Sequence, residues 1–343
     1  MPSTSFYAKT GGLILWLILH SIMVANSQSG DYYSIVNEAE NEVLLEKYGD
    51  AIPLYKKAFE INPMPFPKDL HNALLCSIKS EDEASSKAFI DKILQFDIDT
   101  IFYHTSDKLQ ELHASSELYG YFNSQLKNRV HYFKMNCRYY DKLFALDQTI
   151  RQTCKEINTN YYAECGEEIK LLDSLNLLSL QKHFNAYGVP CEVEFCQINP
   201  SAAPPYLLVV KHNMQWARNS LDSILLNAIN DFRLHPQLYS DMVDYYNEST
   251  LKKPAVFGLG YNIKLGDRLF VWDVPAELKS TINASRNSIH LDSIEVYNAK
   301  VIFQYRHPEF LLIYPQLLAT LDAGPEMEKE LAEKWKDIEV FRN

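Results

Sequence analysis

The chain has 343 residues, with 33 Lys and Arg against 44 Asp and Glu, and its net charge is −11. The apolar fraction of 47 % is that of an ordinary globular protein, so the length suits two domains with hydrophobic cores. The acidic balance and the lack of a Lys/Arg run argue against nucleic-acid binding, because phosphate recognition needs clustered positive charge.

The first 27 residues have the pattern of a secretory signal peptide. Lys9 is the only charged residue of this segment, and an apolar run extends from Gly11 to Ala25. Ala25 and Ser27 place small residues where a signal peptidase cleaves. The run is shorter than the roughly 20 residues of a spanning helix, so an uncleaved anchor is the weaker alternative. We expect an exported protein, periplasmic or extracellular, with no membrane span after cleavage.

Residues 28–130 are expected to form a short array of helices. One stretch, 41–63, has an apolar stripe at helical spacing, formed by Ala51, Ile52, Tyr55, Ala58 and Phe59. Gly49 would make the turn between two helices, Asp50 would cap the second, and Pro53 would lie in its first turn. The stretch resembles a tetratricopeptide repeat, and a weaker second unit follows at 69–94. Such an array would either hold a protein or peptide partner or serve as a structural cap.

A compact domain is expected over 137–305, mainly helical with a few short strands. Helices are predicted at 138–151 and 167–187. In the second of these, the predicted buried side consists of Leu171, Leu172, Leu175, Leu178, Phe184 and Tyr187. Further helices are predicted at 220–232, 236–246 and 291–302, whereas 206–212 fits a helix or a strand equally. A glycine-rich loop or small hairpin should precede Trp272, and in the tail, 306–343, a last helix should run from Pro325 to the end.

Six cysteines allow one or two disulfides in an exported chain, and free buried thiols are the alternative. Five of them lie between Cys137 and Cys196, without the paired spacing of a zinc site. We therefore expect no metal, and the sequence indicates no cofactor. The pairing and the oligomeric state are left open.

The order of polar residues after position 137 resembles the DUF6624-like group, a family of uncharacterised domains in exported proteins of Bacteroidetes. The residues that carry the resemblance are Asp147, Gln148 and Arg151, then Asp173 and Asn176, then Tyr187, Gly188 and Pro190, the run Leu207 to His212, Tyr239 with Asp241, and Ile282 to Leu291. The chain differs from the family pattern at Val189, Met242 and His290. The resemblance implies a bacterial envelope protein, and no established activity.

Seven of these polar residues are candidates for one pocket. His212 with acidic partners among Asp147, Asp173 and Asp241 would be the catalytic group of a hydrolase, since histidine transfers protons and a carboxylate orients it. Arg151, Gln148 and Asn176 are candidate ligand-binding residues, Arg151 through its rigid fork.

Two functions follow from these candidates, together with a purely structural alternative. The first is an envelope interaction or ligand-binding protein, and the second is a hydrolase-type enzyme that uses His212. In the structural alternative, the same Asp–Arg contacts only fix helix packing. Convergence of His212 with at least two of its polar partners would favour the enzyme.

Overall fold

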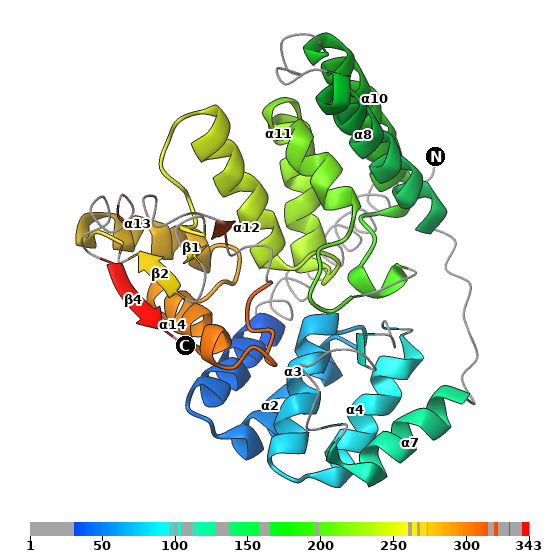
Figure 1. Cartoon of the computed structure of the whole chain (residues 1–343), viewed down its shortest axis with the longest axis vertical. Helices are drawn as coiled ribbons and strands as arrows, with labels where there is room; N and C mark the ends of the chain where they lie inside the picture. The colour runs from blue at the N-terminus through cyan, green and yellow to red at the C-terminus, as the bar shows by residue number, and fades with distance from the viewer. Residues whose placement is uncertain are drawn as a thin grey trace, which may run out of the picture.

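The computed structural model is mainly α-helical, with one small sheet (Figure 1). It describes residues 31–96, 98, 102–103, 112, 114–127, 137–157, 165–195, 199–259, 263–265, 268–272, 274–314, 319–321, 329 and 338–342. The predicted signal segment and most of the predicted last helix lie outside these residues. None of the described helices is long and apolar enough to cross a bilayer.

The amino-terminal part is a row of helices, each packed on the next. Residues 31–44 form the first helix. It is followed by α2 (Tyr48–Ile61), α3 (Pro67–Lys79), α4 (Glu83–Gln95) and α7 (Ser116–Lys127). The predicted stripe from Ala51 to Phe59 is buried throughout. Two details of this helix were predicted wrongly: α2 begins one turn earlier than expected, so Asp50 lies in its first turn instead of capping it, and Pro53 lies inside the helix.

The second part is built on α8 (Cys137–Ile157), α10 (Gly166–Tyr187), α11 (Tyr206–Asn230) and α12 (Pro236–Tyr245). The ambiguous segment 206–212 is the start of α11, which continues without a break through the helix predicted at 220–232. A 3-10 turn, η2 (Glu192–Glu194), precedes α11, and a π-helical turn, η3 (Tyr246–Thr250), follows α12.

The buried side of α10 was predicted correctly at Phe184 and wrongly at three leucines and Tyr187. Leu171, Leu175 and Leu178 are 64 %, 55 % and 53 % exposed, and Tyr187 is also exposed. The helix buries Phe184 as predicted, and its other buried residues are Ile169, Asp173, Asn176, Leu177 and Leu180. Two polar residues thus face inward while three leucines face outward, because the helix is rotated to bring Asp173 against α8.

A small four-stranded sheet lies beside α13 (Ala276–Asn287) and α14 (Ile294–Arg306). Its order is β3 (Ala319–Leu321), β1 (Ile263–Leu265), β2 (Arg268–Trp272) and β4 (Ile338–Arg342). The expected hairpin before Trp272 is formed by β1 and β2. The helix predicted from Pro325 to the end is wrong over 338–342, which pairs antiparallel with β2 and so satisfies its backbone in the sheet.

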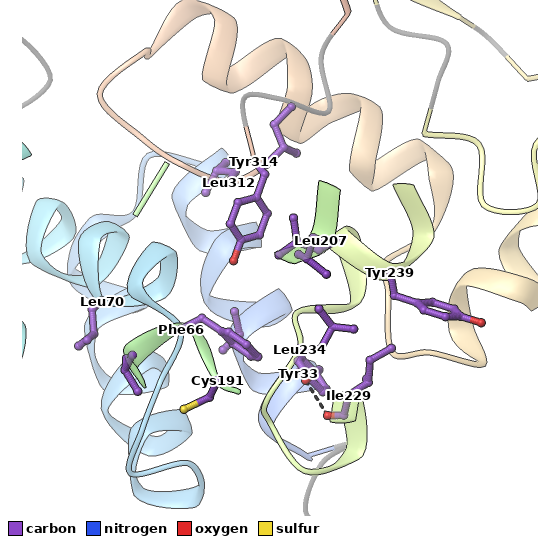
Figure 2. Packing of buried hydrophobic residues seen from close by; sticks show 14 of the residues in the cluster. Tyr33, Phe66, Leu70, Cys191, Leu207, Ile229, Leu234, Tyr239, Leu312 and Tyr314 are labelled. Atoms are coloured by element: carbon purple, nitrogen blue, oxygen red, sulfur yellow. Dashed lines mark hydrogen bonds between the residues drawn. The ribbon is translucent and has the colours of Figure 1, made fainter. Parts of the chain in front are cut away.

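One hydrophobic core joins the amino-terminal helices to the rest of the chain. Figure 2 shows Tyr33 and Phe66 packed with Leu207 and Tyr314, which come from segments far apart in the sequence. The Tyr33 hydroxyl donates to the Ile229 carbonyl oxygen at 2.9 Å. The first helix and α3 are therefore held by α11 and by residues 310–314.

A buried network of charges lies in this shared region. Glu40 of the first helix accepts from Lys68 of α3 at 2.6 Å and from Lys300 of α14 at 2.5 Å. Lys68 also contacts Asp69, and Lys300 contacts Asp292. Burial opposes ionisation of Glu40, but the two ammonium groups more than offset it and hold the pKa of this carboxyl below its ordinary value.

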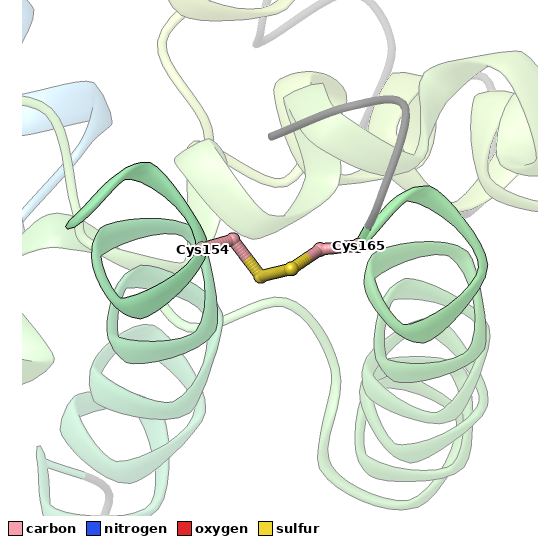
Figure 3. Close-up of a disulfide and its surroundings, with 2 residues drawn as sticks. All are labelled: Cys154 and Cys165. Atoms are coloured by element: carbon pink, nitrogen blue, oxygen red, sulfur yellow. A yellow bond between two sulfur atoms is a disulfide. The ribbon is translucent and has the colours of Figure 1, made fainter. Parts of the chain in front are cut away.

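A disulfide between Cys154 and Cys165 joins the end of α8 to the start of α10 (Figure 3). It closes a short loop between neighbouring helices, which restricts the unfolded chain. Cys76 and Cys191 are buried free thiols. The side chains of Cys137 and Cys196 lie outside the described part of the chain.

Replacing Lys68 with Met should lower the free energy of unfolding by about 3–5 kcal/mol, because it removes the ion-pair partner of buried Asp69 and leaves Glu40 with Lys300 alone. Denaturant unfolding measures this change. Lys170→Met is the matched control, since it removes an ion pair with Glu167 that is mostly exposed and should cost at most about 1 kcal/mol. Equal effects of the two substitutions would contradict the role given to the network.

Glu192 is a second buried carboxyl of this region. The Tyr314 hydroxyl donates to its two oxygens at 2.8 and 3.0 Å. Burial raises the pKa of Glu192 to about 8, although the bond from Tyr314 and the charge of Lys68 oppose the rise. The folded protein therefore keeps a proton that the unfolded chain releases above its ordinary pKa of 4.5.

This difference predicts that Glu192 destabilises the fold increasingly as pH rises from about 4.5 to about 8. Glu192→Gln, which stays neutral, should gain in melting temperature relative to the unmodified chain across this window. The melting temperatures of the two proteins are compared at each pH, so that the contributions of other titrating groups, such as buried His235, cancel in the difference. A constant difference between the two proteins from about pH 5 to about pH 8 would contradict the assignment.

Candidate functional site

Three helices bring most of the predicted polar residues together. Asp147 and Arg151 are one turn apart on α8, Asp173 lies on α10, and His212 lies on the first half of α11. Helical spacing places Asp147 and Arg151 on one face, so both can point toward the neighbouring helices. The predicted convergence of His212, Asp147, Arg151 and Asp173 is present.

Asp147 is the centre of the group and is fully buried. Its carboxylate accepts from Arg151 Nη1 at 2.7 Å and from Gln148 Nε2 at 2.7 Å. His212 Nδ1 lies 2.9 Å from Oδ2 and 3.1 Å from Oδ1 of the same carboxylate. When the imidazole is neutral, its Nδ1 carries the proton toward Asp147, and Nε2 retains a lone pair.

Arg151 links the two carboxylates. Its Nη1 also donates to the Asp147 carbonyl oxygen at 3.0 Å, and its Nη2 donates to both oxygens of Asp173 at 2.8 and 2.9 Å. Burial raises the pKa of Asp173 above its ordinary value, although the Arg151 guanidinium opposes this. Since both terminal nitrogens of Arg151 are occupied, the fork predicted for a ligand carboxylate or phosphate is used within the protein.

Asp241 is not part of this group. Its carboxylate accepts from Lys211 at 2.9 Å, and the Lys211 ammonium also lies 4.5 Å from the centre of the Tyr245 ring. The expectation that Asp241 orients His212 is therefore not met by the contacts. Sequence analysis missed Lys211 for two reasons. A lysine beside a histidine forms no recognisable motif, and the sequence does not show that α11 places Lys211 next to Asp241 on α12.

A pocket of about 370 Å³ is lined by residues of α8, α11 and α12 and by the segment before α11. Asp147, Arg151, Asp173 and His212 are not among its lining residues. Its walls are mostly apolar, and the pair formed by Lys211 and Asp241 supplies the charges. The lining side chains include Phe144, Leu207, Leu208, Lys211, Leu238, Asp241 and Met242. Leu208 is one helical turn before His212, and Phe144 is one turn before Asp147, so the pocket adjoins the polar group along both helices.

Two buried amides close to the group have unpaired atoms. Asn176 lies one turn after Asp173 on α10, and Asn213 follows His212 on α11. Asn176 Nδ2 and Asn213 Oδ1 are buried, and neither has a hydrogen-bond partner among the described residues. Because buried polar atoms are nearly always paired, each such atom calls for an explanation.

The charge of the group is fixed by its members. Two carboxylates face one guanidinium, so the group has one net negative charge when His212 is neutral. Such an arrangement disfavours an anionic ligand and can stabilise positive charge that develops on the imidazole. Within the described part of the chain, no cluster of three or more His, Cys, Asp or Glu has the geometry to hold a metal ion.

Comparison with known proteins gave no match to any family model, to any curated protein or to any solved structure.

The contact of His212 with Asp147 predicts its tautomer. In the neutral state the proton should be on Nδ1, which is the less common form for a free imidazole, because only Nδ1 faces the carboxylate. Long-range nitrogen–proton correlation spectra of the labelled protein distinguish the two ring nitrogens. Asp147→Leu should return the ring to the ordinary Nε2-protonated form, and the same spectrum for both proteins would contradict the contact.

Proposed function

We propose that the group around His212 is the acid–base centre of a hydrolase-type enzyme that acts on a neutral substrate with an apolar part. The observation that supports this most is the contact of His212 Nδ1 with fully buried Asp147, which is itself fixed by Arg151. The sequence alone left three hypotheses open, and the convergence of His212, Asp147 and Arg151 favours the enzyme among them.

The proposed role of His212 follows from its orientation. Asp147 fixes the ring through Nδ1, so Nε2 is available to accept a proton; no described residue bonds to it. The side chain of His212 is 22 % exposed, whereas Asp147 is inaccessible. A water molecule that loses its proton to Nε2 can attack a carbonyl carbon, and the imidazolium then returns the proton to the leaving group.

The substrate class follows from charge and from the adjoining pocket. The negative charge of Asp147 and Asp173 exceeds the single positive charge of Arg151, which opposes the approach of phosphate or carboxylate groups. The pocket bounded by Phe144 and Leu208 has the size and the apolar walls of a small-molecule site. An ester or amide with an apolar acyl group fits both conditions.

The arrangement of α10 is a second argument. This helix buries Leu177 and Leu180, but it also turns Asp173 and Asn176 inward and leaves Leu171, Leu175 and Leu178 exposed, which stability alone would not favour. Replacing a buried ionic group by apolar residues is often stabilising, so its retention points to a use beyond packing.

The proposed location is outside the cytoplasm. The predicted signal peptide is its basis, and the disulfide between Cys154 and Cys165 supports it, because disulfides persist in oxidising compartments. The tetratricopeptide-like and DUF6624-like resemblances remain predictions, as does a peptide partner for the amino-terminal helices.

The test is hydrolysis of neutral p-nitrophenyl acetate and butyrate by the purified protein. His212→Gln should lower kcat/KM by about 100-fold to 10,000-fold, because a general base is lost. Its melting temperature should change little, since His212 is partly exposed and Asp147 keeps Arg151 as a partner. The anionic p-nitrophenyl phosphate should not be hydrolysed.

His307→Gln is the control, because His307 is also partly exposed but lies after α14, away from the group. Turnover that is equal in His212→Gln and in the control would contradict catalysis by His212. No turnover of either ester, with binding seen in the pocket, would favour a ligand-binding protein. A collapse of the fold in His212→Gln would favour the structural alternative.

A further inference from the structure

We propose that a polar cleft between the first helix and the turn after α13 binds a neutral, hydroxyl-rich ligand, namely a short oligosaccharide. The cleft has a volume of about 470 Å³, within the range of ligand sites. It shares no residue with the group around His212 or with the pocket beside it. The two proposals are therefore independent.

One wall of the cleft is a polar stripe of the first helix. Ser34, Asn37, Glu38 and Asn41 are spaced by three, four and seven residues, so they lie on one face of this helix. The opposite face of the helix belongs to the hydrophobic core. A stripe made only of hydroxyl, amide and carboxylate groups beside a cleft is suited to binding through hydrogen bonds.

The other wall comes from the last residue of α13 and from the segment that joins α13 to α14. Asn287 and His290 face the same cleft. His290 has a φ of 65°, the left-handed region that side chains other than glycine seldom adopt. Its ring stacks on Tyr33, with 5.4 Å between ring centres and 14° between planes. The imidazole is thus held in one orientation at the edge of the cleft.

The amide of Asn37 is also fixed in place. Its Nδ2 donates to the His290 carbonyl oxygen at 3.2 Å, and its Oδ1 accepts from Lys300 at 3.3 Å. Lys300 belongs to the buried charge network, so both walls are held by the same contacts. A site that is rigid before binding loses less entropy when the ligand arrives.

The chemistry of the lining indicates hydroxyl groups. An Asn side chain offers two donors and an acceptor, and a sugar hydroxyl both donates and accepts. The side-chain amides of Asn41 and Asn287 form no hydrogen bond with the described residues, so they are available. The carboxylate of Glu38 can accept from two neighbouring hydroxyls.

The charge of the cleft disfavours other ligands. Glu38 has no cation beside it among the described residues, and the charge of Asp292 is balanced by Lys300. Burial lowers the pKa of His290, so its ring is neutral near pH 7. A phosphate or an acidic sugar would be repelled by the net negative charge. A metal ion or a polyamine would find only a single uncompensated carboxylate, that of Glu38, to bind to.

The experiment measures binding of three neutral trisaccharides, maltotriose, cellotriose and triacetylchitotriose, to the purified protein by saturation-transfer NMR and calorimetric titration. At least one should bind. Asn41→Ala and Asn287→Ala should each weaken that binding by about threefold to tenfold, the effect of one lost hydrogen bond. Asn185→Ala, an exposed position on α10, is the matched control and should leave binding unchanged.

Two results would overturn the proposal: no binding of any of the three sugars, or sugar binding that both cleft substitutions leave unchanged. In the first case spermidine is titrated as well, to see whether it binds and whether Glu38→Gln abolishes that binding. Spermidine binding that is lost in this way would identify a cation site instead. The melting temperatures of Asn41→Ala and Asn287→Ala should match that of the unmodified protein, because neither amide contributes to the described fold.

Discussion

The fold depends on the contact of Glu40 with Lys68 and Lys300, since this contact joins the first helix to α3 and to α14 across more than half of the chain. All three groups are removed from water, which is costly unless each charge is paired. An apolar contact tolerates small shifts of one helix along another. A carboxylate held between two ammonium groups tolerates few, so this network fixes the alignment of the amino-terminal helices on the carboxyl-terminal ones.

Both proposed sites use rigid frames of this kind. The polar cleft lies directly over the network, because Asn37 bonds Lys300 and Asp292 contacts the same ammonium group. The group around His212 has its own frame, in which Arg151 holds Asp147 and Asp173 on two helices that the disulfide joins farther along. In each case, the side chains available to a ligand are supported by buried partners that cannot reorient freely.

The structure could be predicted from the sequence where a local pattern determines it. It could not be predicted where contacts with distant parts of the chain determine it. The stripe from Ala51 to Phe59 is buried as predicted, because helical spacing places its members together and α2 therefore has one main apolar face. The partnership of Asp147 and Arg151 follows from the same spacing. The rotation of α10 does not, because leucines at 171, 175 and 178 make an equally regular apolar face and only contact with α8 selects the other one. Likewise, 338–342 form a strand because β2 is beside them, and the cleft exists because residues about 250 positions apart meet.

The unpaired amides beside His212 bear on whether that group is structural or functional. A network selected only for stability would satisfy its buried donors and acceptors, since each unpaired atom costs about 1–3 kcal/mol. Asp147 and Arg151 follow that rule, with every contact well formed. Asn176 Nδ2 and Asn213 Oδ1 do not; Asn176 lies one turn after Asp173 on α10, and Asn213 follows His212 on α11. In the proposed site, the side of Asp147 is already satisfied, and Asn176 Nδ2 and Asn213 Oδ1 are the buried atoms that a substrate or a water molecule would pair. Buried atoms without a partner also occur elsewhere in the described chain, at Asn62 and Tyr206, so this asymmetry supports the proposal only together with the contact of His212 with Asp147.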